Sequence, residues 1–265
     1  MIILTGSQGF IGKNFLKKIN GPVIKVEKED AYSFISNFDK WNEVSLILHQ
    51  GAISSTTEKN ITTLHHSNVA FTLFLFEKAI QYGIPVKYAS SASVYGNQTK
   101  DLKIINPLNY YAITKLQIDY FVQDNLDKFS IIQGFRYFNV YGYGEEHKGD
   151  QASPVSKFTK QIRETGKLKL FRGSDKFLRD FICVDDIINV VLHNKESSGI
   201  YDLGTGTPIS FQEVAELVAG KEKGEIEYID FPENLKGKYQ DYTCADMDWI
   251  GNYKFKTVQE YLMLN

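Results

Sequence analysis

The first twelve residues constrain the fold of this chain more than any other stretch. An apolar run, Ile2–Thr5, leads directly into Gly6-Ser-Gln-Gly9-Phe-Ile-Gly12, which spaces its glycines as G-x-x-G-x-x-G. Glycines at a strand–helix turn let the backbone approach a pyrophosphate, which then sits on the N-terminus of the helix. A tight turn without a ligand would have the same spacing. Its position directly after the first apolar run favours dinucleotide binding.

Apolar runs and helical patterns alternate through the first half of the chain. Between residues 28 and 43 the periodicity is weak and leaves room for one brief helix. We expect strands at 2–5, 23–26, 44–49, 85–90 and 130–135, and helices at 10–19, 63–82 and 108–126. This β/α alternation predicts an α/β fold with a doubly wound parallel sheet.

The pattern loosens after Tyr141. Residues 1–141 therefore read as a dinucleotide-binding domain, with returns to the main sheet near 180–205, and residues 142–265 as mainly a smaller annex that binds substrate. In this half we expect strands at 167–171, 180–184, 199–203 and 225–229, and helices at 152–165, 185–194, 210–219 and 257–264.

Composition excludes several classes of function. The formal net charge is −2 and the lysines are scattered, so we expect no nucleic-acid partner and no binding to an anionic membrane. No apolar stretch approaches the roughly 20 residues of a membrane span, and no basic n-region with a cleavage site opens the sequence, so we expect a cytoplasmic protein. Cys183 and Cys244 are expected to be free thiols, and the five histidines lack metal-ligand spacing, so we expect no metal site.

Tyr111 and Lys115 are the strongest candidates for catalysis. They lie four residues apart in a predicted helix, so both side chains point to one face. We expect the ammonium of Lys115 to stabilise the phenolate of Tyr111 and to lower its pKa from about 10. Ser91, at the end of a predicted strand, can hydrogen-bond the same substrate hydroxyl. A Tyr-x-x-x-Lys spacing also arises by chance on helix surfaces, but here it follows the glycine turn and the Ser90-Ser-Ala-Ser-Val-Tyr-Gly96 segment. The set indicates hydride transfer at an alcohol carbon.

Glu27, at the end of the second strand, stands where an acid would hydrogen-bond an adenosine ribose. A carboxylate there favours NAD, because it repels the 2′-phosphate of NADP. Lys28 follows directly and would have the opposite effect, and a solvated loop charge is the simpler reading of both. The choice of cofactor stays open on these residues.

Six further segments extend these motifs: Gly51-Ala-Ile-Ser-Ser-Thr-Thr-Glu58, Gly134-Phe-Arg-Tyr-Phe-Asn-Val-Tyr-Gly142, Glu146-His-Lys-Gly149, Leu170-Phe-Arg-Gly-Ser174, Phe177-Leu-Arg-Asp-Phe181 and Leu235-Lys-Gly-Lys-Tyr239. With them, the chain resembles over nearly its whole length the extended short-chain dehydrogenase/reductase family of nucleotide-sugar epimerases, most closely the ADP-L-glycero-D-manno-heptose 6-epimerases. The family has a Rossmann sheet.

The resemblance implies a role for particular residues. Tyr111 and Lys148 would be the two acid/base groups, since an epimerase needs proton carriers on both faces of the sugar, and Lys115 would bind the nicotinamide ribose with Ser91 beside it. A solvated charge is the alternative for Lys148. Cofactor contacts are expected from Gly6, Gly9, Phe10, Ile11, Gly12, Glu27, Gln50, Gly51, Ala52, Ser54, Asn68, Tyr111, Lys115 and Val140. Substrate contacts are expected from Ser91, Asn139, Asp150, Lys157, Phe171, Arg172, Gly173, Ser174, Arg179 and Tyr239.

Three departures from the family are visible. Asp150 stands where the family has a serine, and Lys157 where it has a histidine. Both family residues contact substrate, so the sugar of this chain can differ. The chain is also short between Glu27 and Val44, where the family uses lysines to hold a 2′-phosphate. The resemblance implies NADP and Glu27 favours NAD, with one tightly held cofactor per subunit.

The function expected from this reading is epimerisation of a nucleotide-diphosphate sugar through a transient ketone, most closely at C6 of a heptose. The alternatives are a 4-epimerase, dehydratase or reductase acting on another nucleotide sugar, and a non-catalytic dinucleotide sensor. A dehydratase places an acidic pair beside the serine, where this chain has Ala92 and Ser93. By analogy with the family we also expect a homo-oligomer, paired through the helices at 63–82 and 108–126.

Overall fold

The computed structural model describes residues 1–97, 104–233 and 240–264. Compactness divides them into two units. The first comprises residues 1–94, 107–137 and 188–201, and the second comprises the described parts of 95–106, 138–187 and 202–265. The chain passes between the units within helix α7 (Val184–His193) and strand β10 (Gly199–Leu203).

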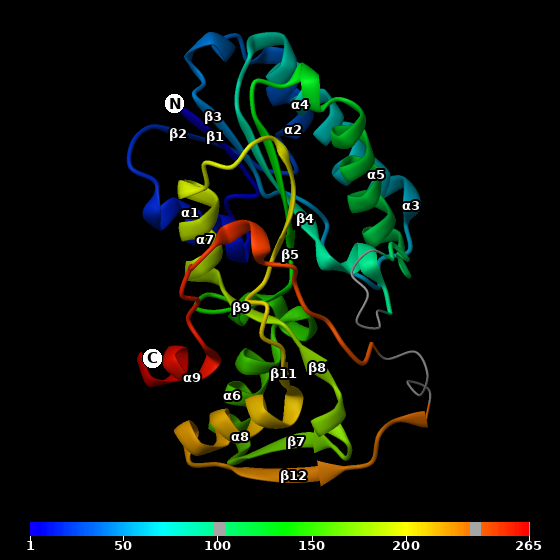
Figure 1. The fold of residues 1–265 in the computed structure, drawn as a ribbon, viewed down its shortest axis with the longest axis vertical. Coiled ribbons are helices and arrows are strands. Elements are labelled where there is room, and N and C mark those ends of the chain that lie inside the picture. The colour runs from blue at the N-terminus through cyan, green and yellow to red at the C-terminus, as the bar shows by residue number, and fades with distance from the viewer. Residues whose placement is uncertain (98–103, 234–239, 265) are drawn as a thin grey trace. The chain divides into compact units, whose positions relative to one another are not determined.

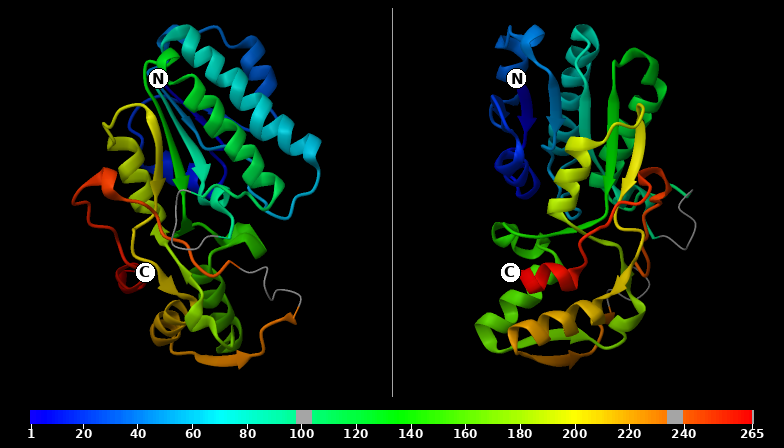
Figure 2. Two further views of the ribbon diagram at one scale, coloured as in Figure 1. Left: turned by 45° about the vertical axis from the view of Figure 1, so that its right-hand side comes forward. Right: turned by 60° about the vertical axis from the view of Figure 1, so that its left-hand side comes forward.

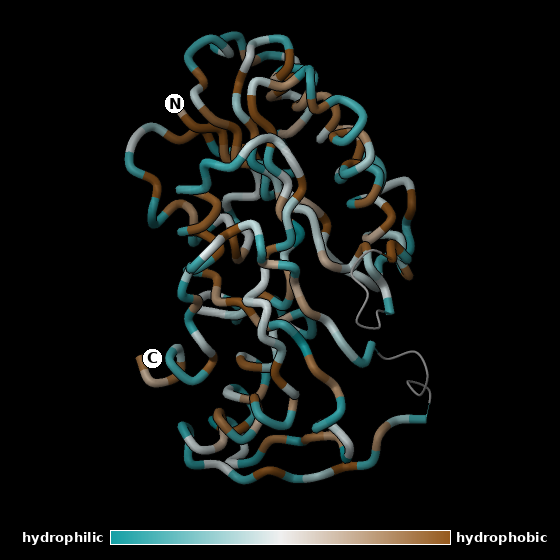
Figure 3. The backbone as a smooth tube through the Cα atoms, in the orientation of Figure 1, coloured by the Kyte–Doolittle hydropathy of each residue, from teal (hydrophilic) through white to brown (hydrophobic). Residues whose placement is uncertain are grey.

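A six-stranded sheet in the order β10-β5-β4-β3-β1-β2 forms the centre of the first unit (Figure 1). Its strands are β1 (Ile2–Thr5), β2 (Val23–Val26), β3 (Leu46–His49), β4 (Val86–Ser91), β5 (Ile132–Tyr137) and β10. The recorded pairings of β1 to β5 are parallel. Apolar residues run along these strands (Figure 3), because both faces of the sheet are covered. The predicted doubly wound sheet is confirmed.

Helices cover the two faces of this sheet. Helix α1 (Phe10–Lys18) lies on one face, and α3 (Ile61–Leu64), α4 (Phe71–Tyr82) and α5 (Tyr110–Asp124) lie on the other (Figures 1 and 2). Helix α2 (Ala31–Asn37) packs beside α4, where Phe34, Phe38, Trp41 and Tyr82 form a chain of aromatic contacts. Short 3-10 turns follow at Trp41–Glu43, Ala92–Tyr95 and Leu126–Lys128.

The sequence predicted one helix over residues 63–82, but the structure divides this stretch. It begins at Ile61, where the Asn60 side chain accepts from the Thr63 N–H, and residues His65–Ala70 form a π-helical turn between α3 and α4. A π-turn inserts one extra residue into the helix and occurs often at functional sites. Apolar periodicity does not reveal it, because the turn interrupts the spacing only locally.

The second unit contains three two-stranded sheets. Strand β6 (Asn139–Tyr141) pairs with β9 (Phe181–Cys183), β7 (Lys167–Phe171) with β12 (Glu225–Ile229), and β8 (Leu178–Arg179) with β11 (Ile209–Ser210). Of the two strands expected to return to the main sheet, β10 does so, whereas β9 pairs with β6. Strands β6, β8 and β11 were not predicted, since runs of two or three residues carry no periodicity.

Three helices of the second unit surround its apolar core. They are α6 (Pro154–Thr165), α8 (Phe211–Glu222) and α9 (Val258–Leu264), with 3-10 turns at Glu146–Gln151, Ser174–Lys176 and Asp248–Ile250. Val155, Phe158 and Ile162 of α6 pack there with Val214 and Val218 of α8. Ser210 caps α8, and with Glu213 it forms a complete capping box.

Candidate active site

The glycine turn after β1 packs this closely only because its glycines have no side chains. Gly6 has φ +66°, and a Cβ there would lie 2.6 Å from the Cα of Gly51. A Cβ on Gly12 would lie 2.1 Å from the carbonyl oxygen of Gly6. Gly9 occupies the N-cap of α1, where no described side chain caps the first N–H groups. The turn is therefore closely packed, and it leaves the N-terminus of α1 available to an anion.

The turn borders a cavity of about 350 Å³ within the first unit. The sheet order reverses here: the chain leaves β1 for β2 on one side and returns to β3 on the other, and ligands of such sheets bind at this switch point. Six predicted cofactor residues line the cavity, namely Gly6, Gly9, Glu27, Gln50, Gly51 and Ala52. The other predicted cofactor residues lie outside this lining, namely Phe10, Ile11, Gly12, Ser54, Asn68, Tyr111, Lys115 and Val140.

The cavity also has lining residues that the sequence did not indicate. Most come from α2, the π-turn and the residue after it, and the set comprises Ala31, Tyr32, His66, Ser67 and Phe71, together with Ile53 after β3 and Thr5 and Val26 at the strand ends. The rings of Tyr32 and His66 stack with centroids 4.1 Å apart, and the Tyr32 hydroxyl donates to the His66 carbonyl at 2.7 Å. An apolar, partly aromatic wall suits a planar base. The weak periodicity of residues 28–43 concealed this contribution.

Glu27 is half-buried at the end of β2. Its Oε1 accepts from the Ser7 hydroxyl and from the Gln8 N–H at 3.2 Å, so the carboxylate lies across the start of the glycine turn. Lys28 lines the same cavity. Both charges that the sequence singled out therefore border the cavity that can hold the adenosine end of a dinucleotide.

A chain of buried hydrogen bonds through His49 supports the part of the cavity wall that Gln50 and Gly51 form. The N–H groups of Gln50 and Gly51 donate to Thr5 Oγ1, at 3.1 and 2.9 Å, and Thr5 Oγ1 lies 2.8 Å from Nδ1 of His49. Nε2 of His49 lies 2.8 Å from Thr72 Oγ1, which itself donates to the Asn68 carbonyl. These directions require a neutral His49 protonated at Nε2. Burial first, and then the charge of Lys115, lower the pKa of His49 to about 3.

Gln50 carries an unsatisfied group. Its Oε1 accepts from the Tyr137 hydroxyl at 3.0 Å, while its buried Nε2 has no hydrogen-bond partner within the described residues. A buried donor without a partner is costly unless a ligand satisfies it. Together with the open helix N-terminus and the glycine turn, it makes the residues present fit a bound dinucleotide.

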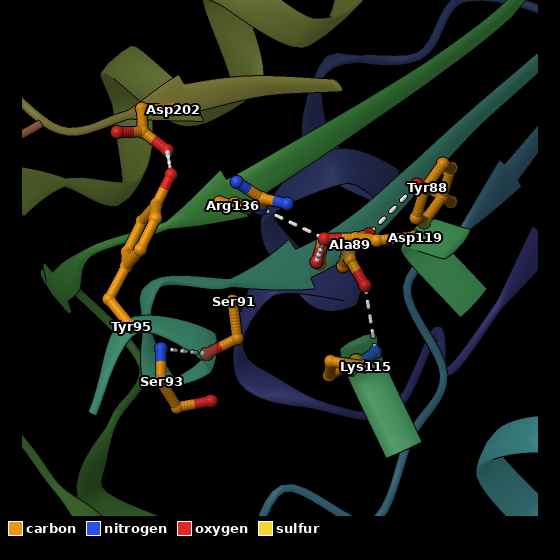
Figure 4. Close-up of polar contacts among 10 residues, drawn as sticks. Tyr88, Ala89, Ser91, Ser93, Tyr95, Lys115, Asp119, Arg136 and Asp202 are labelled. Atoms are coloured by element: carbon orange, nitrogen blue, oxygen red, sulfur yellow. Dashed lines mark hydrogen bonds and ion pairs between the residues drawn. The ribbon is translucent and has the colours of Figure 1, made fainter. Parts of the chain in front are cut away.

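Ser91, Tyr111 and Lys115 come together at the carboxyl end of β4. Asn109 caps α5 by accepting from the Ala112 N–H at 2.9 Å, which places Tyr111 in the first turn and Lys115 one turn later. The Lys115 ammonium is 6% exposed, donates to the Ala89 carbonyl at 2.7 Å (Figure 4), and lies 5.9 Å from the centroid of the Tyr111 ring. Ser91 forms a side-chain hydrogen bond with Tyr111.

The expected lowering of the Tyr111 pKa is wrong for this structure. Burial raises the pKa above its usual value, the Ser91 hydrogen bond lowers it in part, and the Asp119 carboxylate raises it further. The Lys115 ammonium itself donates to the Ala89 carbonyl. Burial also lowers the pKa of Lys115 to about 8, against an upward contribution from Asp119. Desolvation of the phenolate thus outweighs the attraction to a nearby ammonium.

Ser93 is a further polar residue that the sequence did not single out. Its N–H donates to Ser91 Oγ at 3.2 Å (Figure 4), and its own buried hydroxyl has no partner among the described residues. The hydroxyl can therefore hydrogen-bond a substrate bound beside Ser91. Its position in a serine-rich segment was visible in the sequence, but its lack of a partner was not.

Asn68 lies within the π-turn and connects the cavity loop to α5. Its Oδ1 accepts from the Ile53 N–H at 2.8 Å, and its Nδ2 donates to the Ile53 carbonyl and to Thr114 Oγ1. Thr114 in turn donates to the Tyr111 carbonyl at 2.7 Å. The Asn68 amide is thus engaged by the protein itself, which fits a supporting role better than the direct cofactor contact that the resemblance implied.

Lys148 lies in the second unit, in a loop organised by a buried carboxylate. Glu145 is 1% exposed and accepts from the Gly142 N–H, the Ser153 N–H and the Ser153 hydroxyl, at 2.9, 2.6 and 2.8 Å. Its carbonyl also accepts from the Lys148 N–H at 2.8 Å. Burial lowers the pKa of Lys148, Glu145 raises it and Lys157 lowers it again.

Asp150 and Lys157, the two residues that differ from the family's substrate-contacting residues, contact each other. The Lys157 ammonium, on α6, donates to the backbone carbonyl of Asp150. Gly149, between Lys148 and Asp150, has φ +52° and ψ −123°, a conformation that favours glycine. Lys157 and Glu145 therefore hold the Lys148 loop from two sides.

The remaining predicted residues of the second unit lie on strands and turns. Val140 pairs with Ile182, and the Asn139 N–H donates to the Asp180 carbonyl at 3.0 Å. Arg179 is 5% exposed, donates to the carbonyls of Leu178 and Gln240, and lies over the Phe211 ring at 5.6 Å. Asp180 does not pair with it but accepts from three backbone N–H groups and the Thr205 hydroxyl.

The 171–174 segment forms a turn after β7. Ser174 donates to the Phe171 carbonyl at 2.7 Å, Gly173 has φ +83°, and the exposed Arg172 lies 3.5 Å from Asp230. Tyr239, also predicted to contact substrate, lies outside the described residues.

No helix in the described ranges is both long and apolar enough to span a bilayer.

Comparison with known proteins identifies the family. A model described as NAD dependent epimerase/dehydratase family matches residues 2–204. The ADP-L-glycero-D-manno-heptose-6-epimerase of Helicobacter pylori is 25% identical, with a TM-score of 0.79 over 99% of this chain and 93% of that chain. The UDP-glucose 4-epimerase of Thermotoga maritima is 22% identical, with a TM-score of 0.83 over 99% and 96%. The UDP-N-acetylglucosamine 4-epimerase of Methanobrevibacter ruminantium is 17% identical, with a TM-score of 0.84 over the same shares. The predicted family is thus confirmed, and this chain belongs to the NAD dependent epimerase/dehydratase family.

Proposed function

We propose that this protein is a nucleotide-sugar epimerase that oxidises one carbinol carbon of the sugar to a ketone and reduces it again from the other face. The observation that carries this proposal is the meeting of Ser91, Tyr111 and Lys115 at the end of β4. The same compact unit holds the glycine turn and the cavity beside it. A proton-transfer group and a dinucleotide site on one sheet are the parts that alcohol oxidation requires.

NAD is the cofactor that we propose. The turn at Gly6 and Gly9 and the N-terminus of α1 would hold the pyrophosphate, Glu27 the adenosine ribose, and Gln50 the cofactor through its unsatisfied amide. Tyr111 and Lys115 would lie at the nicotinamide end. When bound, the cofactor would accept and return the hydride, and its positive charge would favour the phenolate of Tyr111.

Titration with each cofactor tests this choice. We expect NAD⁺ to bind more tightly than NADP⁺, because Glu27 repels a 2′-phosphate, and we expect Glu27→Gln to narrow the difference. Glu29→Gln is the matched control, since Glu29 is exposed nearby and does not line the cavity. The readout is the dissociation constant from calorimetry. Tighter binding of NADP⁺ by the wild-type protein would contradict the proposal and make Lys28 the selective charge.

The proton steps fall to this chain's own residues. Ser91 hydrogen-bonds the reacting hydroxyl and Tyr111 accepts its proton as the carbinol C–H leaves as hydride, so that the alcohol becomes a ketone. For the return step, a proton must reach the new alkoxide from the opposite face of the sugar. Lys148 is the candidate donor, because its pKa is lowered by burial towards the range where an amine exchanges protons readily. No net oxidation occurs over one cycle.

The substrate that we favour is an ADP-linked heptose, with C6 as the reacting carbon. The segments that carry the resemblance, above all Glu146-His-Lys-Gly149, support it. Asp150 and Lys157 replace two substrate-contacting residues of that subfamily, so an altered sugar is the expected difference. Asn139, Arg179 and the 171–174 turn are the candidates for holding the nucleotide diphosphate, for which an arginine fork is well suited.

Tyr111→Phe tests the catalytic assignment. We expect epimerisation to fall by about 10²–10⁴-fold, because the variant loses its proton-transfer group, while the circular dichroism spectrum stays unchanged. Product stereochemistry is read by NMR after incubation with ADP-, GDP- and UDP-linked sugars. Near-normal epimerisation by the variant would exclude Tyr111 as the acid/base.

The same assay separates the alternative functions. The fold is at least as similar to two 4-epimerases as to the heptose epimerase, by TM-scores of 0.83 and 0.84 against 0.79. Inversion at C4 of a UDP-sugar would therefore replace the heptose assignment and keep the mechanism. Net consumption of reduced cofactor would identify a reductase, and binding without turnover a sensor.

A further inference from the structure

A buried carboxylate, Asp119, lies one helical turn beyond Lys115 and has no part in the steps above. Its side chain is fully buried on α5. Oδ1 accepts from the Tyr88 hydroxyl at 3.0 Å, while Oδ2 accepts from the Ser90 hydroxyl at 3.0 Å and from Arg136 Nε at 2.8 Å (Figure 4). Burying a carboxylate is costly unless donors compensate the charge, and three donors do so around Asp119.

Helix α5 is attached to β4 at two successive turns. Tyr88 and Ser90 point to the same side of β4 because they are alternate residues of the strand, and both donate to Asp119. Ala89, between them, offers its carbonyl to Lys115. Together these bonds fix the helix along the strand that ends at Ser91. Because Tyr111 precedes Lys115 by one turn, the same register decides where its phenol meets Ser91.

The neighbouring strand β5 completes the arrangement. Arg136 stands opposite Ser90 in the β4–β5 register. Gly134 stands opposite Tyr88, and a Cβ at Gly134 would lie 2.3 Å from Cζ of the Tyr88 ring. The glycine therefore makes room for the ring that reaches Asp119. Phe76 packs on the Tyr88 ring, with centroids 5.5 Å apart.

The charged and titratable groups around Asp119 come from several elements. Tyr88 faces it from β4, Arg136 from β5, and Tyr111 and Lys115 from its own helix. His49, on β3, faces Lys115 and is neutral. Asp119 raises the pKa of both Tyr111 and Lys115, so it favours the phenol and the ammonium forms.

We propose that Asp119 is a positioning residue of the Tyr111–Lys115 site, which fixes the register of α5 on β4 and supplies the negative charge that faces Lys115. The proposal deepens the proposed function and rests on it for its catalytic consequence. The placement of the three residues at i, i+4 and i+8 on one helix face, with the third held by three donors, is the observation that carries it.

Asp119→Asn removes the charge and keeps the shape. Tyr111 is followed by NMR of ¹³Cζ-labelled tyrosine, and its signal is assigned by its loss in Tyr111→Phe. We expect the midpoint of Tyr111 and the acid limb of the kcat profile to move to lower pH, because Tyr111 acts as its phenolate, and kcat to fall by up to about 100-fold as the geometry loosens. Asp124→Asn, which changes an exposed acid of the same helix, should move none of these.

Further variants separate this role from a structural one. Asp119→Asn with Arg136→Met removes the ion pair as a unit, so that no guanidinium is left without its carboxylate, and we expect the lowered Tyr111 midpoint to persist. Asp119→Glu restores the charge and should return the midpoint towards wild type. Folded variants that keep the wild-type midpoint and pH profile, and lose only thermal stability, would overturn the proposal.

The two proposals fail in different ways. The NMR midpoint of Tyr111 requires no turnover, so it decides the role of Asp119 even if no nucleotide sugar is epimerised. A wild-type protein inactive on every sugar tested would defeat the proposed function, while an unmoved midpoint in both folded charge-removing variants would defeat the role of Asp119.

Discussion

At the scale of single residues, this protein buries lysines against backbone carbonyls rather than carboxylates. Lys87, on β4, is 8% exposed and donates to the carbonyls of Val191 at 2.6 Å and Asn194 at 3.0 Å, at the C-terminal end of α7. A cation is favourable there because of the helix dipole. Burial nevertheless lowers the pKa of Lys87 to about 8, so desolvation is the larger effect.

The shift of Lys87 predicts how stability depends on pH. Between about pH 8 and 10.5 the unfolded state binds more protons than the folded state, so the free energy of unfolding rises with pH across this window. A shift from 10.5 to about 8 corresponds to about 3 kcal/mol. We expect Lys87→Met to reduce this rise in denaturant titrations, leaving the contribution of Lys115, whereas the exposed Lys195→Met should leave it unchanged. An equal rise in both variants would contradict this reading.

Residue types were more predictable than their environments. Ser91, Tyr111 and Lys115 were selected by type and spacing, and the structure brings them together. The predicted direction of the Tyr111 pKa shift was wrong, because that shift depends on burial and on the nearby Asp119 carboxylate. Neither of these quantities is local in sequence.

At the scale of elements, hydrogen bonds at its two ends hold the loop that carries Lys148. Glu145 joins Gly142 to Ser153, and Ser153 caps α6 by accepting from the Ser156 N–H. One buried carboxylate thus closes a loop of about ten residues onto a helix N-terminus, a position that also favours negative charge.

We expect Lys157 to affect the pKa of Lys148 across this loop. Its charge lowers the pKa of Lys148, so Lys157→Met is expected to raise that pKa. Because Lys148 must be protonated to donate, the alkaline limb of the kcat profile moves to higher pH in this variant. Lys160→Met serves as the control, since Lys160 lies on the same helix and is exposed. An alkaline limb that stays in place would remove Lys157 from the catalytic account.

Regular elements were predicted closely where their pattern was long. Strands β1, β2, β7, β10 and β12 have the predicted bounds, and helices α1, α5, α6 and α8 differ from prediction only at their ends. The π-turn was missed because it interrupts the helical spacing only locally, and the short strands of the second unit because they are too short to show periodicity. The aromatic wall of the cavity was missed because it combines residues from distant segments.

At the scale of the whole molecule, an exposed apolar stripe marks the outer face of α5. Tyr110, Ile113 and Tyr120 are 43, 39 and 53% exposed and recur at helical spacing, and Phe74 of α4 is 45% exposed. Exposed apolar side chains that gather on one face of a helix mark a candidate protein–protein contact surface. We propose that a second copy of this chain covers it.

The oligomer prediction is tested by light scattering after size exclusion. We expect a dimer for the wild-type protein and a monomer for Ile113→Glu combined with Tyr120→Glu, because two charges would be buried without partners. Met263→Glu, at an exposed apolar residue of α9, should leave the dimer intact. A monomeric wild-type protein would disprove the prediction.

The sequence by itself determined the class of the sheet, the glycine turn and the choice of Ser91, Tyr111 and Lys115 as the side chains proposed to react, because these depend on local spacing and on residue chemistry. Only the tertiary structure decided which groups are buried, what each buried charge contacts, and which segments form the cavity wall. The reason is physical: pKa values and hydrogen-bond partners follow from desolvation and from contacts between distant segments. Asp119 illustrates this, since in sequence it is one acid among many and in the fold it lies where α5, β4 and β5 meet.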